Sequence, residues 1–269
     1  MTRTASGIVY LIIIIGSLIL GKYFFGALFL LIGVLALAEF YKLTGNTVNV
    51  QGRILGILAA SFIYILSFLV TSQSVGYEWL SLIAILPVLF LIAALYVQKS
   101  DLIKSLSVNF LGIIYVILPL SLLNYLVFPA GHNYVYTHRI VLGIFTLVWI
   151  NDSGAYLFGI MLGRHKLLPR VSPKKSWEGL MGGTLLTLVA AFWMDTLMGI
   201  LTQINWMVLA IIVSVFGVFG DLTESMIKRN AGMKDSGSIM PGHGGVLDRF
   251  DSLLFVVPVS FIYLIVNGL

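Results

Sequence analysis

The sequence predicts an all-α, polytopic integral membrane protein with about nine transmembrane helices. The chain has 269 residues, of which 59% are hydrophobic and only 10% are charged, against about 25% charged in an ordinary soluble domain. A bilayer core about 30 Å thick requires about 20 apolar residues per helix, and nine predominantly apolar runs of roughly this length occur in the chain. These observations exclude a soluble globular protein.

The expected spans follow one another closely. The first two, 6–21 and 23–41, are separated by one short connection with no clear small-residue cleavage site, so we expect a helical hairpin and no signal peptide. The other seven are expected at 54–73, 79–98, 106–128, 139–162, 179–200, 204–224 and 250–268. No long linker interrupts them, and we therefore treat residues 1–269 as a single membrane domain.

The cations of the loops predict the orientation in the membrane. Lys and Arg are retained on the cytoplasmic side of short loops. With the N-terminus inside, only Lys22 and Arg139 of the 16 Lys and Arg residues fall on the opposite side. The split predicts a protein of the cell inner (plasma) membrane type, with a cytoplasmic N-terminus and a C-terminus on the opposite side.

Charge and composition narrow the chemistry further. The net charge of +5 does not indicate nucleic-acid binding, because a basic stripe for nucleic acid needs a water-soluble surface. The chain has no cysteine, so oxygen or imidazole ligands would hold any metal. Charged residues gather after residue 150. We therefore separate N-terminal helices of unassigned role, 1–150, from a half expected to be catalytic, 151–269.

The last expected cytoplasmic loop, with its flanking helix ends, collects polar residues. Asp221, Ser225 and Lys228 are spaced i, i+4, i+7, which places them on one face of a helix. Asp248 and Asp251 are spaced i, i+3 at the edge of the bilayer, where carboxylates are costly and commonly functional. These features suit a metal-bridged phosphate, with Asp221, Asp248 and Asp251 as oxygen ligands for Mg²⁺.

The same loop also offers groups that bind anions. A glycine-rich run, 241–245, precedes the last helix and presents backbone N–H groups, while Lys228 and Arg229 can bind phosphate oxygens. Structural explanations remain open for each feature alone: acids favoured by the helix dipole, cations retained for topology, and His243 as an ordinary loop residue. Their coincidence in one short segment favours a site.

A second polar stretch runs from Asn151 to Gly179. Asp152 falls inside an apolar run, where a carboxylate is more often functional than structural. Ser176 is expected to cap the next helix, with Glu178 in its first turn. Five cations between these points would each attract anionic lipid headgroups by about 1 kcal/mol: Arg164, Lys166, Arg170, Lys174 and Lys175.

These residues carry a family resemblance. The run from Ser225 to Asp251, SMIKRNAGMKDSGSIMPGHGGVLDRFD, closely resembles the signature of the phosphatidate cytidylyltransferases, also called CDP-diacylglycerol synthases. The upstream segments DSGAY, LGRHKL and SPKKSWEG are similar to that family as well. The resemblance in motifs covers about residues 151–251, and nine spans fit the architecture of the family.

The resemblance implies a nucleotidyltransferase of phospholipid biosynthesis. It would transfer CMP from CTP to phosphatidic acid, forming CDP-diacylglycerol and pyrophosphate by Mg²⁺-dependent attack of the lipid phosphate on the nucleotide α-phosphate. It implies Mg²⁺ as cofactor and leaves open a monovalent cation such as K⁺. Asp221, Asp248 and Asp251 become the metal-site carboxylates and, with Lys228, the catalytic residues. The expected substrate-binding residues are Ser225, Arg229, Lys234, His243, Gly244, Gly245, Arg249, Lys174, Lys175 and Asp152.

Two further classes of function stay open at this point. A related membrane enzyme could act on another lipid phosphate or alcohol, as an isoprenoid lipid cytidylyltransferase or a lipid kinase. A transporter fits less well, because transporters commonly have repeated halves, whereas the charge of this chain is uneven between its halves. The expected partners are CTP, phosphatidic acid and the lipid bilayer, with no nucleic acid; a homodimer is left open.

Overall fold

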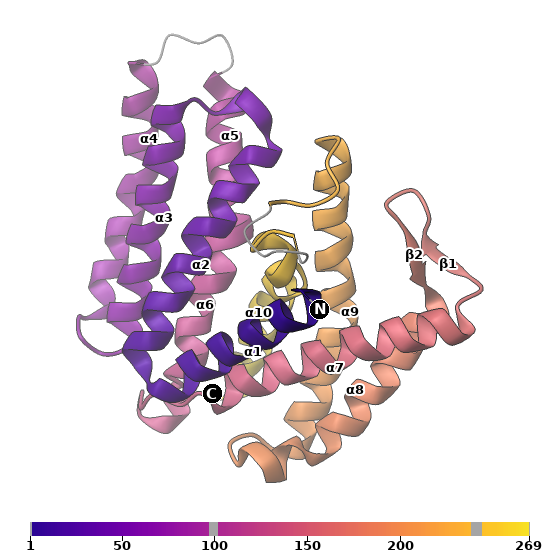
Figure 1. The fold of residues 1–269 in the computed structure, drawn as a ribbon. Helices are drawn as coiled ribbons and strands as arrows, with labels where there is room; N and C mark the ends of the chain where they lie inside the picture. The colour runs from indigo at the N-terminus through magenta and orange to yellow at the C-terminus, as the bar shows by residue number, and fades with distance from the viewer. Residues whose placement is uncertain (1, 97–101, 238–243, 269) are drawn as a thin grey trace. The chain divides into compact units, whose positions relative to one another are not determined.

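The computed structural model describes residues 2–96, 102–237 and 244–268, and Figure 1 shows helices throughout and a single β-hairpin in this part of the chain. The α-helices are α1 (Thr2–Leu20), α2 (Lys22–Leu43), α3 (Val50–Thr71), α4 (Ile85–Leu95), α5 (Leu102–Gly112), α6 (Leu118–Val127), α7 (Arg139–Leu162), α8 (Trp177–Met198), α9 (Gln203–Asn230) and α10 (Leu247–Val266). The strands are β1 (Lys166–Leu168) and β2 (Ser172–Ser176). Short 3-10 turns cover Gly45–Thr47, Tyr77–Ala84 and Ala130–His132, and a π-helical turn covers Ile113–Ile117.

The expected helical membrane fold is confirmed, with one difference in the spans. Within the described residues, 8 helical segments are long and apolar enough to cross a membrane. Two of them are composite: Tyr77–Leu95 joins a 3-10 turn to α4, and Leu102–His132 contains α5 and α6. The first of the nine expected spans, 6–21, corresponds to α1, whose apolar part, Ser6–Leu20, is shorter than the other eight.

The chain divides into two compact units. Unit 1 contains Met1–Tyr136 and Asp235–Asp248, and unit 2 contains Thr137–Lys234 and Arg249–Leu269. The boundary between them differs from the division at residue 150 that the distribution of charge suggested. The signature run is shared, because its central part belongs to unit 1 and its two ends belong to unit 2.

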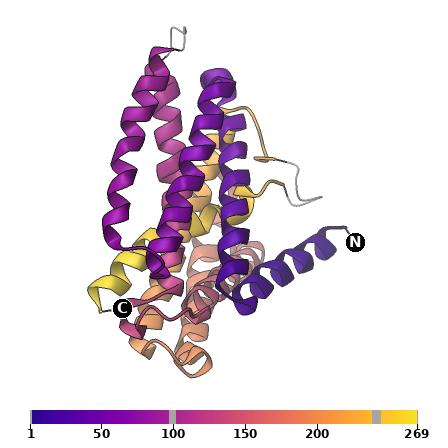
Figure 2. The ribbon, with the colours of Figure 1, turned by 90° about the vertical axis from the view of Figure 1, so that its left-hand side faces the viewer.

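Unit 1 is a bundle in which α2, α3, α4 and α6 run side by side, while α1 leaves α2 at an angle (Figure 2). Close packing requires small residues in α2: a Cβ on Gly33 would lie 3.3 Å from Ile117 Cδ1. The π-helical turn between α5 and α6 precedes Pro119, which lacks an N–H donor and whose ring crowds the preceding turn. The long span Leu102–His132 therefore remains helical on both sides of Pro119.

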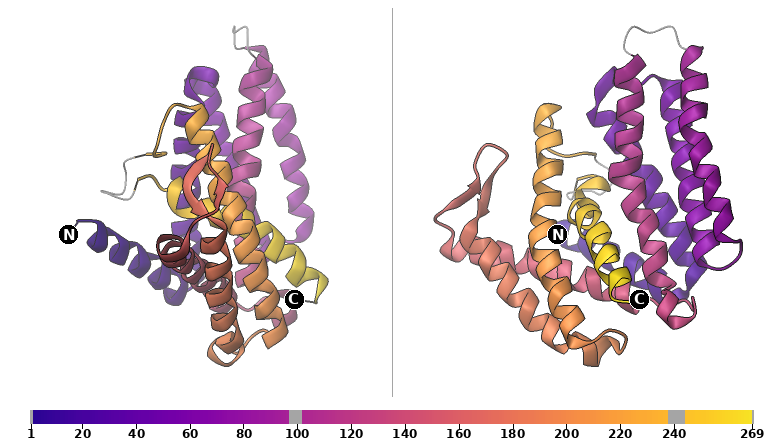
Figure 3. Two further views of the ribbon diagram at one scale, coloured as in Figure 1. Left: turned by 90° about the vertical axis from the view of Figure 1, so that its right-hand side faces the viewer. Right: turned by 180° about the vertical axis from the view of Figure 1, so that it is seen from behind.

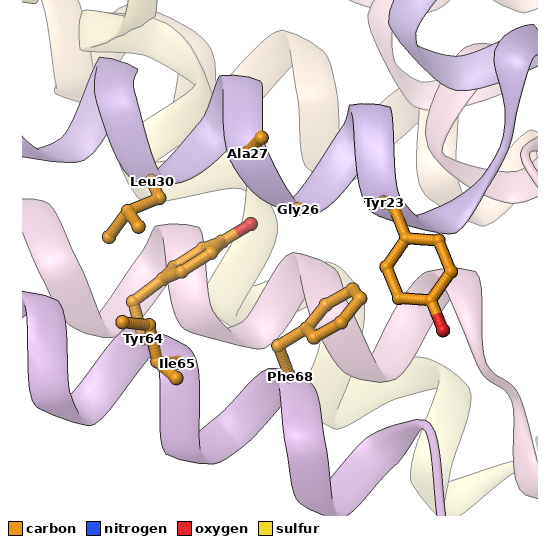
Figure 4. A pocket seen from close by; sticks show the side chains of 7 residues that line it. All are labelled: Tyr23, Gly26, Ala27, Leu30, Tyr64, Ile65 and Phe68. Atoms are coloured by element: carbon orange, nitrogen blue, oxygen red, sulfur yellow. The ribbon is translucent and has the colours of Figure 1, made fainter. Parts of the chain in front are cut away.

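A cavity of about 200 Å³ lies between α2 and α3 of unit 1. Figure 4 shows Tyr64 and Phe68 of α3 facing Tyr23, Gly26 and Leu30 of α2 across it. Its lining, completed by Ala27 and Ile65, contains no charged side chain. Because nothing in this lining can neutralise a phosphate, the cavity is not the candidate site.

Unit 2 is built on the close pair α7 and α8. A Cβ on Gly154 would lie 3.0 Å from Gly183 Cα, and one on Gly183 would lie 2.8 Å from the Asn151 carbonyl oxygen. Such backbone contact between membrane helices needs small residues. Ser176 caps α8 as expected, because its Oγ accepts a hydrogen bond from Gly179 N at 3.2 Å.

The connection from α7 to α8 forms an antiparallel hairpin, which the sequence did not predict (Figure 3). Lys166 pairs with Ser176 and Leu168 with Ser172. Two prolines, Pro169 and Pro173, and strands of only 3 and 5 residues gave no recognisable strand pattern. The hairpin ends at the cap of α8 and thereby holds Lys175 at a defined position beside that helix.

Candidate metal and phosphate site

Two glycines of α9 bring α10 close to the polar residues of unit 2. A Cβ on Gly217 would lie 3.7 Å from Ser252 Cβ. At Gly220, a Cβ would overlap the carbonyl oxygen of Asp251 and lie 3.0 Å from Ser252 Cα. Because Asp221 follows Gly220 directly, this backbone contact places the carboxylates of Asp221 and Asp251 in one neighbourhood.

Three carboxylates form a cluster at this contact. Asp221 and Glu224 of α9 and Asp251 of α10 each offer an oxygen, and these oxygens all lie within 4.8 Å of one another. Glu224 is fully buried, and its two partners are half-buried. Negative groups so close together repel one another in a poorly solvated place, so the cluster needs cations nearby.

Lysine side chains supply part of that charge. Lys175 Nζ, at the end of β2, lies 2.5 Å from Asp221 Oδ2, and Lys228 Nζ lies 2.5 Å from Glu224 Oε2. Ser225 Oγ donates a hydrogen bond of 3.2 Å to Asp221 Oδ1. Asp221 and Ser225 are therefore neighbours on one face of α9, as predicted. Lys228 pairs with Glu224, and Asp221 pairs with Lys175 from the hairpin.

Further charges of unit 2 surround the cluster. The exposed carboxylate of Asp152, on α7, lies within electrostatic range of Asp221, Lys175 and Arg249, and it also acts on Asp251. Four acids thus share one environment with two paired lysines. A hard divalent cation, which prefers several carboxylate oxygens, fits this donor set and this excess of negative charge.

Asp248 lies in unit 1 and has a different environment. Its Oδ2 accepts hydrogen bonds from Gly245 N at 2.7 Å, from Ser236 N at 3.0 Å and from Ser236 Oγ at 3.0 Å. Gly244 has φ +85, and a Cβ there would lie 2.5 Å from the same oxygen. This oxygen of Asp248 thus orders the signature segment, and a direct role of Asp248 in metal binding stays a prediction.

Four other predicted residues, Arg229, Lys174, Lys234 and Arg249, belong to unit 2. Arg229 Nη1 donates to the Met233 carbonyl oxygen at 3.4 Å, at the end of α9. Lys174, Lys234 and Arg249 are exposed. His243 lies outside the described residues.

Sequence reasoning missed Glu224 in the cluster of unit 2, and it missed Glu39 and Ser236 in unit 1. Glu224 had a signal, because it stands three positions after Asp221 and four before Lys228 on the helix face already identified. Glu39 is a carboxylate inside the expected span 23–41, which is costly in a membrane. Nothing in the sequence indicated the partners of Ser236.

Fold and site together define a polytopic helical membrane protein with a carboxylate cluster flanked by lysines. The chain matches the model of the cytidylyltransferase family over residues 1–266, and it belongs to that family. It is similar to proteins named phosphatidate cytidylyltransferase from three staphylococci. Identity is 48% over 129 residues with that of Staphylococcus epidermidis, covering 47% of this chain and 49% of the relative.

The two other staphylococcal relatives match a similar length of the chain at similar identity. Identity is 46% over 145 residues with the protein of Staphylococcus saprophyticus, covering 50% and 54% of the two chains. It is 48% over 131 residues with that of Staphylococcus aureus, covering 46% and 48%. The matched part therefore spans about half the length of these curated relatives.

Proposed function

We propose that the protein transfers CMP from CTP to phosphatidic acid, giving CDP-diacylglycerol and pyrophosphate. The observation that carries this proposal is the cluster of Asp221, Glu224 and Asp251, with lysines on two of its members, in a chain of the cytidylyltransferase family. The relatives named phosphatidate cytidylyltransferase support the lipid and the nucleotide.

The reaction asks little of a general base. A phosphomonoester has a second pKa near 6, so phosphatidic acid is largely dianionic at neutral pH. One of its oxygens forms a bond to the α-phosphorus of CTP, the bond from that phosphorus to the bridging oxygen breaks, and pyrophosphate leaves with the electron pair. Alignment and charge neutralisation then account for most of the catalysis.

The residues of unit 2 suit that task. Asp221, Glu224 and Asp251 would hold Mg²⁺, which supplies neutralisation and alignment of phosphate oxygens. Lys175 and Lys228 lie at the same carboxylates and offer ammonium donors for phosphate oxygens and for the charge on pyrophosphate. Asp248 holds Ser236 and Gly245, and so orders the part of the signature expected to bind substrate.

The proposed site belongs to the cytoplasmic side of the membrane. Lys228 and Arg229 end α9, and the loop cations favour the cytoplasm for this helix end. A soluble nucleotide would enter from water, whereas a lipid with two acyl chains would enter from the leaflet. This placement agrees with the exposed cations of the hairpin, which attract anionic headgroups.

A double-label assay tests the proposal. Purified protein receives phosphatidic acid and CTP labelled with ³²P at either the α- or the γ-phosphate, with and without Mg²⁺ and K⁺. We expect label in the lipid only from α-labelled CTP, and no product after chelation of divalent cations. Label in the lipid from γ-labelled nucleotide would instead indicate a kinase.

A substrate panel tests the identity of the lipid and of the nucleotide. Isoprenoid phosphates and lipid alcohols replace phosphatidic acid, and other nucleotides replace CTP. A product formed with an isoprenoid phosphate and not with phosphatidic acid would overturn the assigned lipid. The absence of any labelled lipid, from protein that remains monodisperse, would overturn the enzymatic function and leave the transporter.

A further inference from the structure

A buried carboxylate of α2 contacts the part of the signature run that belongs to unit 1. We call this part the signature segment; its described residues are 235–237 and 244–248. Glu39 lies near the C-terminal end of α2 and is only 1% exposed. An ionised carboxylate at such a depth is stable only when several donors satisfy its oxygens. The identity of those donors therefore indicates what Glu39 does.

Every donor recorded for Glu39 belongs to the signature segment. Val246 N donates to Oε1 at 3.1 Å, and Leu247 N donates to Oε2 at 2.8 Å. Ser236 Oγ donates to Oε2 at 3.0 Å. These partners stand 197 to 208 positions further along the chain, so the contact joins the otherwise unassigned N-terminal helices to the motif.

The segment is shaped to admit this carboxylate. A Cβ on Gly237 would overlap Glu39 Oε1, and a Cβ on Gly245 would overlap Glu39 Oε2. Any side chain at either position would displace the carboxylate. The two glycines therefore leave the space that the Glu39 carboxylate occupies, and the three hydrogen bonds hold it there.

Ser236 links Glu39 to Asp248. Its Oγ lies 3.0 Å from Glu39 Oε2 and 3.0 Å from Asp248 Oδ2, and its N–H donates to Asp248 as well. Two carboxylates thus tie Ser236 to residues 245–248. Leu247 is the first residue of α10, so Glu39 also satisfies an N–H at the start of that helix.

We propose that Glu39 is a positioning residue for the proposed reaction: its carboxylate holds Ser236 and the start of α10 in the conformation that serves the handling of substrate phosphates. This role rests on the proposed function, but its structural part can be tested without turnover. Glu39 acts through Ser236, Val246 and Leu247 and does not itself touch substrate.

The test uses Glu39→Gln, which keeps the volume and removes an acceptor. Both oxygens of Glu39 accept from backbone N–H groups, so either orientation of the amide places an NH₂ group against an N–H. We expect kcat to fall about 10- to 100-fold, as for groups that orient catalytic ligands. Glu39→Asp keeps the charge with a shorter reach, and we expect part of the activity to return.

Tyr41→Phe is the matched control. Tyr41 lies two residues further along α2, is also 1% exposed, and donates a buried hydrogen bond of 2.8 Å to Asn109 Oδ1, outside the signature segment. We expect its kcat to stay within about 2-fold of the unmodified protein, because a structural loss of one hydrogen bond leaves the segment in place.

Hydrogen exchange of the full-length protein in nanodiscs gives the second readout. We expect the amides of Val246 and Leu247 to exchange faster in Glu39→Gln and to be unchanged in Tyr41→Phe. If Glu39→Gln does not fold, Ser236→Ala replaces it, with the same expected loss of kcat and faster exchange at residue 236. Equal losses of kcat in Tyr41→Phe, or full activity of the tested variant, would overturn the proposal.

The outcomes separate this inference from the proposed function. If the unmodified protein forms no CDP-lipid, the proposed function fails, whatever the exchange data show. If the unmodified protein is active and exchange at Val246 and Leu247 is unaffected by loss of the Glu39 carboxylate, the positioning role fails and the proposed function stands.

Discussion

Three carboxylates of unit 2 form the cluster that is proposed to bind a metal ion. Asp221, Glu224 and Asp251 are brought within 4.8 Å of one another, at a place where like charges are expensive unless cations compensate them. Lys175 compensates part of this negative charge at Asp221, and Lys228 does so at Glu224. The remaining excess of negative charge is the physical reason to expect a divalent cation.

The carboxylate of Asp251 is expected to be essential. Asp251→Asn keeps the shape and removes the charge, so the cluster loses a hard ligand, and we expect turnover to fall by at least about 100-fold. Asp195→Asn is the control, because Asp195 lies near the end of α8 and outside the cluster. CDP-lipid formation and thermal stability in detergent are measured for both; near-normal turnover of Asp251→Asn would exclude the metal assignment.

Lys175 is expected to act on the anionic substrates. Lys175→Met removes the ammonium group beside Asp221, so we expect KM for CTP or for the lipid to rise about 10-fold, in the range of one charged hydrogen bond. Lys42→Met removes an exposed cation of α2, outside the hairpin, and serves as control. Initial rates at varied CTP and varied phosphatidic acid measure the effect. Unchanged KM and kcat in Lys175→Met would remove Lys175 from the site.

At the scale of elements, helix contacts made by glycine position the site. Gly220 lets the backbone of α10 approach α9 at Asp251, and the hairpin between α7 and α8 carries Lys175 to Asp221. The approach at Gly220 is between backbone atoms and does not involve the carboxylate side chains. The cluster therefore results from packing, and a small change in packing should disturb it.

A methyl group at Gly220 tests this dependence. Gly220→Ala would place a Cβ against the carbonyl oxygen of Asp251, where only backbone can yield. We expect a loss of about 1–3 kcal/mol of stability, as in other overpacked contacts, together with a loss of turnover. Gly16→Ala, at a helical position with open space around it, should leave both near normal. Unfolding in detergent and CDP-lipid formation are the measurements, and a stable, fully active Gly220→Ala would contradict the packing argument.

At the scale of the whole molecule, topology follows from the order of the spans. Eight helical segments of the described chain meet the requirements of length and hydropathy, while the apolar part of α1 is shorter. The distribution of cations predicts that the connection after α2 is cytoplasmic. The chain crosses the membrane nine times if α1 spans it and eight times if α1 does not.

Single introduced cysteines can establish the sidedness, because the chain has none of its own. A membrane-impermeant maleimide is applied to intact cells and to permeabilised cells. We expect Asn267→Cys to react in intact cells, and Thr2→Cys and Thr44→Cys to react only after permeabilisation. Thr44 follows α2 and serves as the cytoplasmic reference. A Thr2→Cys that reacts in intact cells would show that α1 does not cross the membrane.

Composition and pattern by themselves determined the class of fold and most of the helices. Apolar runs of membrane length are a local property, and the signature run from Ser225 to Asp251 carries the family in its order of residues. The faces of α9 and the cap at Ser176 also followed from local spacing, because helix geometry is regular.

Only the tertiary structure decided which distant groups meet. It joined Lys175 to Asp221, added Glu224 to two of the three expected aspartates, and placed Glu39 against Val246 and Leu247. It also gave Asp248 a set of donors from its own segment. The contacts of Lys175 with Asp221 and of Glu39 with Val246 and Leu247 join segments far apart in the chain. They depend on packing and on close approaches permitted by glycines, which no local spacing encodes.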